Sequence, residues 1–201
     1  MINTIIFDLG GVLIDWNPEY VFKDVIPDPE RRRFFFENIC THEWNIEQDA
    51  GRSLAEATEL LVAQWPEWEP EIRTYYDRWE DMLGGSIPET VELLREIRDE
   101  GRLRLLALTN WSAETFPVAL DRYDFLHWFE GIVVSGAEKT RKPFPEIYQT
   151  LLLRYEVAPE FAAFTDDSLA NMQGAEAVGI KGIHFQNAAQ LREALVQLGS
   201  L

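Results

Sequence analysis

The sequence is short of cysteine, of positive charge and of long apolar runs, and each shortage excludes a class of protein. Cys40 is the single cysteine among 201 residues, so the chain can form no disulfide within itself. This cysteine usage is typical of proteins built for a reducing compartment. We expect Cys40 to be a small packing residue rather than a nucleophile.

Positive charge is scarce, because 18 Lys and Arg residues face 35 Asp and Glu residues. The formal net charge is −17 at pH 7. Proteins that bind nucleic acids or anionic membranes need basic surfaces that replace the counterions of phosphate groups. The charge therefore predicts a protein with neither nucleic acid nor membrane as a partner, and it leaves the oligomeric state open.

No stretch of the sequence approaches the roughly 18–20 consecutive apolar residues that span a bilayer. The first residues run straight into an apolar segment that ends at Asp8, without the basic start of a signal peptide. We therefore expect a cytoplasmic protein. Hydrophobic residues make up 46% of the chain, which is enough for one sizeable core, or for one core with a small lid.

Short apolar runs alternate with stretches of helical spacing. The predicted strands are residues 4–7, 103–108, 131–134, 161–164 and 182–185. The predicted helices between and after them are residues 88–100, 144–155, 169–178 and 188–198. This alternation predicts an α/β fold, with a doubly wound, Rossmann-like parallel sheet covered by helices on both faces. We assign residues 1–15 and 86–201 to this core.

Residues 16–85, here called the helical insertion, interrupt the alternation. Helical spacing occurs at 30–39, 53–64 and 70–83, and we predict no strand. The helical insertion holds 12 of the 25 aromatic residues and 16 acidic against 7 basic residues. We expect a helical insertion after the first strand whose aromatic side chains pack together as a small bundle; the alternative is that one or two of them line the roof of a pocket. Gly84, Gly85 and Pro88 would form the hinge back to the core.

Polar residues follow the predicted strands where ligands bind in parallel α/β sheets. In chain order they are Asp8, then Thr109 and Asn110, then Lys142, then Asp166 and Asp167. A carboxylate can attack an electrophile, and a lysine can neutralise developing charge. Hydroxyl and backbone N–H groups can hold anionic oxygens, and paired acids suit Mg²⁺. Each residue alone also fits a turn or a helix cap, but the ordered set favours a functional site.

Four segments resemble the motifs of the haloacid dehalogenase-like (HAD) hydrolase superfamily. Residues 7–13, Phe-Asp-Leu-Gly-Gly-Val-Leu, resemble the first motif. Residues 108–110, 142–143 and 165–168 resemble the second, third and fourth. That superfamily places its small helical cap after the first motif, where the helical insertion lies. The nearest resemblance is to bacterial phosphatases of small metabolites, including the glucose-1-phosphate type.

The resemblance implies a hydrolase that cleaves a small phosphorylated metabolite, such as a sugar phosphate, through an aspartyl-phosphate. Asp8 would be the nucleophile. Thr109 and Asn110 would hold the phosphoryl group, and Lys142 would bind both that group and Asp8. Asp166 would orient Lys142 or a metal-bound water. The substrate would thus be a small phosphorylated anion bound by local positive charge.

The resemblance also implies a Mg²⁺ cofactor. Its protein ligands would be the carboxylates of Asp8 and Asp167 and the backbone carbonyl of Gly10. Most phosphatases of the superfamily, however, carry a second Asp at the position of Gly10, where it protonates the leaving oxygen. The proton donor stays open, with metal-bound water, a residue of the helical insertion and Asp15 as candidates.

Three alternatives to the phosphatase remain open, and Gly10 favours the first two of them. A metal-free 2-haloacid dehalogenase could use Asp8 as nucleophile, because a halide leaves without a proton. A non-catalytic interaction protein on the same scaffold and a phosphotransferase are the other two. The acidic pair Asp166–Asp167 favours a metal and therefore the phosphatase, and some phosphatases of the superfamily also carry Gly at this position.

Several other polar or aromatic residues have less specific expectations. We expect Lys139 and Arg141 to be solvated, and Arg31, Arg32 and Arg33 to form local salt bridges on a solvated helix face. We expect His42, His127 and His184 to be structural or on the surface. Trp111 could stack on a ligand or pack in the core.

Overall fold

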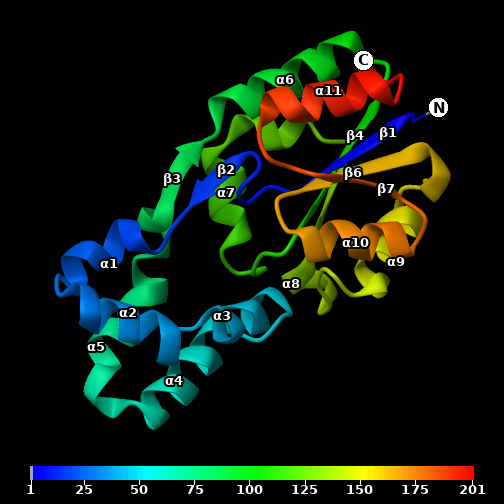
Figure 1. The fold of residues 1–201 in the computed structure, drawn as a ribbon. Coiled ribbons are helices and arrows are strands. Elements are labelled where there is room, and N and C mark those ends of the chain that lie inside the picture. The colour runs from blue at the N-terminus through cyan, green and yellow to red at the C-terminus, as the bar shows by residue number, and fades with distance from the viewer. Residues whose placement is uncertain (1) are drawn as a thin grey trace.

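The computed structural model describes residues 2–201 and has two parts, a sheet-based core and a group of helices beside it (Figure 1). The core sheet contains β1 (Thr4–Phe7), β4 (Arg104–Thr109), β5 (Gly131–Val134), β6 (Ala162–Asp166) and β7 (Lys181–His184). The strand order is β5-β4-β1-β6-β7, and every neighbouring pair is parallel. The predicted α/β fold with a parallel sheet is therefore confirmed.

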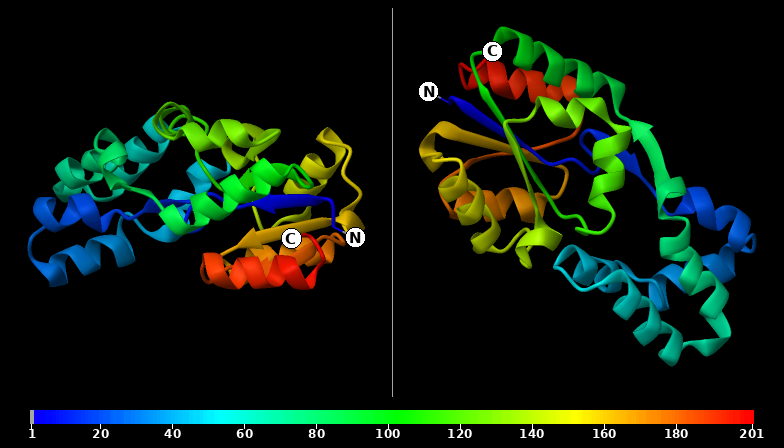
Figure 2. Two further views of the ribbon diagram at one scale, coloured as in Figure 1. Left: turned by 90° about the horizontal axis from the view of Figure 1, so that it is seen from above. Right: turned by 180° about the vertical axis from the view of Figure 1, so that it is seen from behind.

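Side chains of the central strand alternate between two apolar clusters. Ile5 and Phe7 belong to one cluster, and Ile6 between them belongs to the other. On the first face pack α6 (Pro88–Glu100), α7 (Phe116–Arg122) and α11 (Ala188–Gln197). On the second face pack α9 (Pro145–Arg154) and α10 (Leu169–Ala177), as Figure 2 shows. Both faces of the sheet are thus covered, which explains why its strands read as continuous apolar runs.

Short elements complete the core around these layers. They are η3 (Asp124–Trp128), α8 (Ser135–Glu138) and η4 (Pro159–Phe161). The best-predicted helix is α6, which has Pro88 in its first turn and ends at Gly101 with φ of 67°. A left-handed residue after the last turn is the usual glycine C-cap. α10 begins at the Ser168 side chain, which accepts a hydrogen bond from the N–H of Asn171.

The helical insertion contains α1 (Glu19–Val25), α2 (Pro29–Asn38), α3 (His42–Asp49), α4 (Leu54–Gln64) and α5 (Glu69–Asp77). Two 3₁₀ helices, η1 (Pro66–Trp68) and η2 (Trp79–Met82), lie beside α5. The helix predicted at 70–83 therefore ends early, at Asp77. None of the helices in residues 2–201 is long and apolar enough to cross a membrane.

The prediction that residues 16–85 contain no strand is wrong. β2 (Ile14–Trp16) pairs antiparallel with β3 (Leu83–Ser86), and this ribbon joins the helical insertion to the core (Figure 1). β3 reads Leu-Gly-Gly-Ser, a composition that is depleted in strands. Glycine is required there because a Cβ at Gly84 would lie 2.1 Å from the Asp15 Oδ2 atom.

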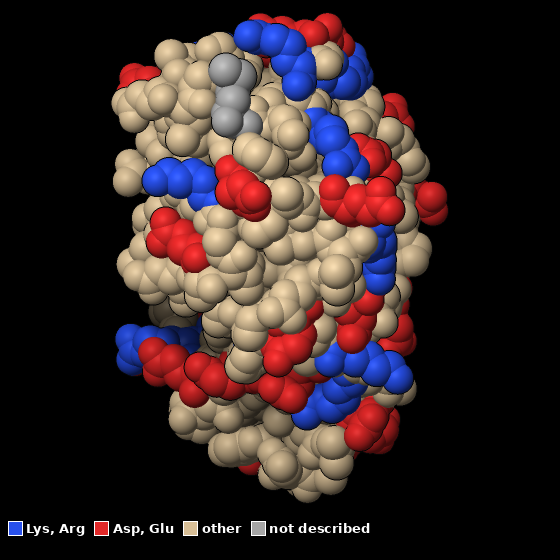
Figure 3. Space-filling view, turned by 90° about the vertical axis from the view of Figure 1, so that its right-hand side faces the viewer, with Lys and Arg blue, Asp and Glu red and all other residues tan. Residues whose placement is uncertain are grey.

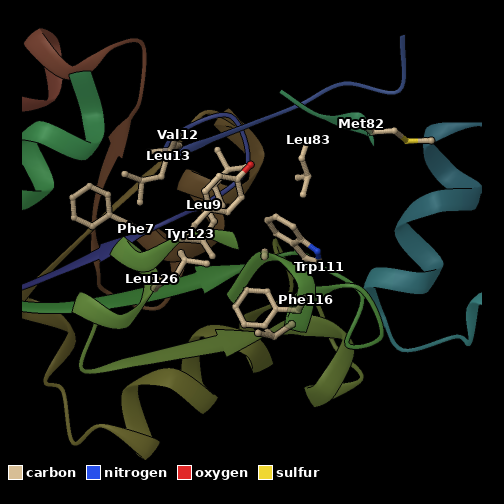
Figure 4. Packing of buried hydrophobic residues seen from close by; sticks show 14 of the residues in the cluster. Phe7, Leu9, Val12, Leu13, Met82, Leu83, Trp111, Phe116, Tyr123 and Leu126 are labelled. Carbon is tan, nitrogen blue, oxygen red and sulfur yellow. The ribbon is translucent and has the colours of Figure 1, made fainter. Parts of the chain in front are cut away.

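Aromatic side chains of the helical insertion pack mainly against one another, as predicted. The Phe22 ring lies 5.0 Å from the Phe35 ring and 5.9 Å from the Tyr75 ring, centroid to centroid. At the junction with the core, Figure 4 shows Leu83 and Trp111 within one apolar cluster. Cys40 is buried in the same cluster, which fits a packing residue.

Charged side chains of both signs intermingle on the surface, as the face drawn in Figure 3 shows. The arginines of α2 follow this pattern, because each pairs with a glutamate, as predicted. The pairs are Arg31 with Glu71, Arg32 with Glu19 and Arg33 with Glu30. Exposed pairs of this kind contribute little to stability, so the run of arginines needs no anion to explain it.

Candidate active site

The carboxyl ends of β1, β4 and β6 bring one lysine between two acids. The Lys142 Nζ atom lies 2.8 Å from Asp8 Oδ1 and 2.7 Å from Asp166 Oδ2. The same ammonium donates a hydrogen bond to the Leu108 carbonyl oxygen at 3.0 Å. The Lys142 side chain is fully buried, so its three partners fix it at the edge of the sheet.

Burial and charge act in opposite directions on this cluster. Burial alone would lower the pKa of Lys142, but the carboxylates of Asp8 and Asp166 outweigh it and raise the pKa above its usual value. Burial raises the pKa of Asp8; the Lys142 ammonium opposes this rise, and Asp166 and Asp167 add to it. Two carboxylates therefore share one ammonium, and a third, Asp167, lies beside them, so this cluster carries excess negative charge.

Asp166 is held by more partners than Lys142 alone. Its Oδ1 atom accepts a hydrogen bond from the N–H of Ser168 at 2.8 Å, and the Asn171 side-chain amide lies 3.2 Å from both carboxylate oxygens. The residue is fully buried. The fully buried Asp166 therefore fixes the position of the Lys142 ammonium. The neighbouring Asp167 is exposed.

The acidic cluster fits a hard divalent cation. One carboxylate oxygen from each of Asp8, Asp166 and Asp167 lies within 4.8 Å of the others. An all-oxygen set with excess negative charge suits Mg²⁺. Gly11 permits this crowding, because it has a φ of 71° and a Cβ there would lie 2.4 Å from the Asp167 Oδ2 atom. Burial raises the pKa of Asp167, and the charge of Asp166 raises it further. A nearby cation would lower this pKa again.

Thr109 and Asn110, at the carboxyl end of β4, differ in what their side chains do. Thr109 is the last residue of β4 and is buried. The Asn110 carboxamide instead clamps the backbone of Lys142: its Oδ1 accepts from the Lys142 N–H at 2.8 Å, and its Nδ2 donates to the Lys142 carbonyl at 3.0 Å. The Asn110 side chain therefore fixes the loop that carries the lysine.

A cavity of about 460 Å³ opens between this cluster and the helical insertion. From the core it is lined by Asp8, Gly10, Asn110, Trp111, Ser112, Thr115, Arg141, Lys142, Pro143, Asp167, Ser168, Ala170 and Asn171. From β2 and the helical insertion it is lined by Trp16, His42, Asn45, Ile46, Gln48, Asp49, Tyr76 and Trp79. The volume suits a small ligand.

Trp111 belongs both to the core and to the cavity wall. Its ring meets Trp79 of the helical insertion edge to face at 5.7 Å and Phe116 of the core at 5.8 Å, centroid to centroid. Its Nε1 donates to the Thr115 hydroxyl at 3.1 Å. The two interpretations of Trp111 are therefore compatible, because one face of a packed residue borders the cavity.

A polar network orders the wall formed by α3 and α5. The Gln48 side-chain amide donates to the Tyr76 hydroxyl at 2.7 Å, and that hydroxyl donates to Asn45 Oδ1 at 3.1 Å. Arg52 Nε in turn donates to Gln48 Oε1 at 2.8 Å. Sequence reasoning missed this network, because no motif marks these residues.

The remaining candidates lie as follows. Lys139 is exposed as predicted, but Arg141 is half-buried in the cavity wall rather than solvated, because the loop to Lys142 folds inward. His127 and His42 are exposed, and His42 also borders the cavity. The His184 ring lies 3.0 Å from the Asp167 carbonyl oxygen, a structural contact.

Comparison with known proteins decides the family. The sequence profile of the haloacid dehalogenase-like hydrolases matches residues 2–179. The chain belongs to the haloacid dehalogenase-like hydrolase family. A sesquiterpene phosphatase of Aspergillus oryzae is 27% identical over 193 residues, covering 96% of this chain and 94% of the relative. A phosphorylated carbohydrates phosphatase of Thermotoga maritima is 25% identical, covering 90% and 84%.

Among solved structures, a HAD family enzyme of Bacteroides thetaiotaomicron in complex with magnesium and inorganic phosphate has the same fold. Its TM-score is 0.72 at 19% identity, covering 92% of this chain and 95% of that one. The protein is thus a HAD-like hydrolase, and several of the proteins it is similar to are phosphatases.

Proposed function

We propose that the protein is a Mg²⁺-dependent phosphatase that hydrolyses a small phosphomonoester through an aspartyl-phosphate on Asp8. The observation that carries this proposal is the buried Lys142 ammonium between Asp8 and Asp166, at the floor of a cavity that also reaches Asp167. The arrangement offers a nucleophile, a positive charge and an oxygen-rich cation site in one place.

In the first step an Asp8 oxygen attacks the phosphorus atom, and the bond to the leaving oxygen breaks. The Lys142 ammonium neutralises charge on the transferring group, and Thr109 and the backbone around Asn110 hold its oxygens. Water then attacks the phosphorus atom and releases phosphate from Asp8. Mg²⁺ held by Asp8, Asp167 and the Gly10 carbonyl would supply further charge neutralisation at the phosphoryl oxygens.

The helical insertion would act as a cap over the core formed by residues 1–15 and 86–201. The cavity lies between the two parts, and the β2–β3 ribbon is a connection between them. A cap that closes over bound substrate excludes bulk water during the first step. Its side chains would then set substrate specificity, with Trp16, Tyr76 and Trp79 facing the bound alcohol.

The experiment that tests this function is a panel of sugar phosphates and other small phosphomonoesters. Purified protein is assayed with Mg²⁺ and with a chelator, and phosphate release is measured. We expect release that requires the metal. Phosphate release that survives complete chelation would contradict the metal-dependent mechanism, and transfer of phosphate to sugar rather than to water would indicate a phosphotransferase.

A 2-haloacid dehalogenase is the second candidate, and Gly10 is the observation that favours it. Chloride release from a 2-halo acid is followed in parallel with the panel. Halide release without phosphate release would replace the phosphatase proposal, because a halide needs no proton donor at residue 10. Absence of both activities would favour a non-catalytic interaction protein.

Mg²⁺ should raise the thermal unfolding temperature of the metal-free protein. A ligand that binds only the folded state at a concentration of 100 times its Kd stabilises by about 2.7 kcal/mol. The Asp167→Asn variant should lose most of this shift because one carboxylate ligand is gone, whereas Asp15→Asn, outside the cavity, should keep it. An equal shift in wild type and Asp167→Asn would remove Asp167 from the ligand set.

A further inference from the structure

The helical insertion brings one carboxyl group into the cavity, that of Asp49. Asp49 is the last residue of α3, is half-buried and lines the same cavity as Asp8. Among the described residues that line the cavity, it is the only acid outside the cluster of Asp8, Asp166 and Asp167. A half-buried carboxyl group without a salt bridge carries a desolvation cost, and its position in the cavity therefore needs an explanation.

Contacts with the core fix the position of Asp49. The backbone of Ser112, in the loop after β4, lies close enough to the Asp49 carboxyl group to lower its pKa. Two residues on, Gly51 has a φ of 100°, and a Cβ there would lie 3.1 Å from the Gly136 carbonyl oxygen. The N–H of Leu54 donates to Glu114 Oε1 at 2.8 Å. The C-terminal end of α3 therefore packs against the core.

The core itself lacks a proton donor at the expected place. Gly10 has no titratable side chain, although a Cβ there would meet no atom within 4 Å. Asp15 is bonded to the Tyr20 hydroxyl and does not line the cavity. The Tyr76 hydroxyl is engaged with Gln48 and Asn45. Residue 10 has open space but no donor, and Asp49 of the helical insertion lines the same cavity as Gly10.

We propose that Asp49 is the catalytic residue that transfers the proton in both steps. In the first step the P–O bond to the alcohol breaks as the Asp8–P bond forms, and the Asp49 carboxylic acid gives its proton to the leaving oxygen. In the second step the Asp49 carboxylate takes a proton from water as that water attacks the phosphorus atom and the Asp8–P bond breaks. Asp49 is thereby reprotonated and Asp8 is regenerated as a carboxylate.

The electrostatics of the site support this role, which rests on the proposed phosphatase function. Burial raises the pKa of Asp49 to about 7, against the opposing charges of Arg141 and Lys142 and the Ser112 backbone. A group whose pKa lies near the working pH can both give and take a proton efficiently. Arg141 and Lys142 also attract the phosphoryl group to this side of the cavity.

The decisive variant is Asp49→Asn, which keeps the shape and the polarity of the side chain but cannot transfer the proton. It is compared with wild type on glucose 6-phosphate, or the best alkyl phosphate of the panel, and on p-nitrophenyl phosphate. The alkoxide needs a proton to leave, whereas nitrophenolate does not. We expect kcat/KM to fall about 10²–10⁴-fold for the alkyl phosphate and to change little for the aryl phosphate.

Matched variants separate this role from others. Glu47→Gln removes one acidic charge from the exposed side of the same helix and should leave both substrates unaffected. Gly10→Asp in the Asp49→Asn protein should restore part of the alkyl phosphate activity, because the open space at residue 10 admits a new donor. His42→Gln should not reproduce the selective loss, and if it does, His42 is the donor instead.

Three outcomes distinguish failure of this inference from failure of the proposed function. Equal losses on both substrates would show that Asp49 has a structural role in holding α3 against the core. Unchanged activity on both substrates would show that Asp49 has no role in the reaction. Either result overturns the inference but leaves the phosphatase intact. Wild-type protein that releases no phosphate from either substrate overturns the phosphatase itself.

A measurement on wild type keeps the test valid if Asp49→Asn does not fold. The ratio of alkyl to aryl kcat/KM should fall as the pH rises through about 7, because only the alkyl reaction needs the protonated acid. The core presents Arg141, Lys142, Asp8 and Asp167 to the cavity that Asp49 lines. The helical insertion presents His42 and Tyr76 to it, with Tyr75, Cys40 and Arg52 packed around Tyr76. Both tyrosine pKa values are raised by burial, so neither titrates near neutrality. A flat ratio from pH 5 to 9 would overturn the inference.

Discussion

Replacing Asp8 by asparagine should abolish phosphate release while the protein stays folded. An amide is a far weaker nucleophile than a carboxylate, and loss of a nucleophile lowers kcat on the order of 10⁴-fold or more. The Asp8 side chain faces the cavity, and Lys142 retains its second partner, Asp166, after the change. Steady-state kinetics on the best substrate of the panel measures the loss.

The fold should tolerate this change because Asp8 is one of three clustered carboxylates, of which Asp166 keeps its contact with the single ammonium. Removing one negative charge reduces the repulsion among the others, so the metal-free variant should unfold at or above the wild-type temperature. Asp15→Asn, on the following strand but outside the cavity, serves as the control and should keep full activity. A folded Asp8→Asn protein with near wild-type kcat would remove Asp8 from the role of nucleophile.

The core could be predicted from the sequence because its signals are local. A strand buried on both faces needs a continuous apolar run. Pro88 and Gly101 are residue types that indicate where a helix begins and ends. β3 could not be predicted, since its Leu-Gly-Gly-Ser sequence forms a strand only where Gly84 allows close contact with Asp15. Pairing with β2 overrides the weak strand propensity of that segment.

The grouping of the candidate site residues at one edge of the sheet was also predictable, for a geometrical reason. The strands of a parallel sheet end at one edge, so residues that follow β1, β4 and β6 must lie together. What the side chains then contact was not predictable. Asn110 was expected to bind the phosphoryl group, yet its carboxamide clamps the Lys142 backbone. Arg141 was expected in solvent, yet it lines the cavity.

Asp49 illustrates the limit of sequence reasoning most clearly. It is one of 16 acidic residues in the helical insertion, and no spacing or motif separates it from the other 15. Only the packing of the end of α3 against the core, with Gly51 close to the Gly136 carbonyl, brings this carboxyl group to the cavity. Sequence reasoning does, however, identify the gap at Gly10 that such a group would fill.

Replacing Lys142 by methionine should destroy activity and also destabilise the protein, unlike the change at Asp8. Methionine fills a similar volume, but it leaves Asp8 and Asp166 without the ammonium that contacts both. Removing one partner of a buried ion pair costs about 3–5 kcal/mol, because the remaining charge stays buried and uncompensated. The loss of charge neutralisation at the phosphoryl group should lower kcat at least about 10²–10³-fold.

The destabilisation should depend on pH in a definite direction. Burial already raises the pKa of Asp8, and removal of the opposing Lys142 charge raises it further. A carboxyl group whose pKa is raised in the folded state favours folding fully only below its unfolded pKa, about 3.9, and loses that contribution as the pH rises through the folded pKa. Lys142→Met should therefore be closer to wild type in stability at pH 5 than at pH 8, in metal-free buffer.

Urea unfolding of wild type and Lys142→Met at both pH values measures this difference. Lys139→Met removes an exposed lysine from the same segment and should show neither the loss of stability nor its pH dependence. If Lys142→Met is destabilised equally at pH 5 and pH 8, the lost free energy of unfolding comes from packing and not from charge. Since the proposed Mg²⁺ site rests on the same excess of negative charge, Mg²⁺ should restore more stability to this variant at pH 8 than at pH 5.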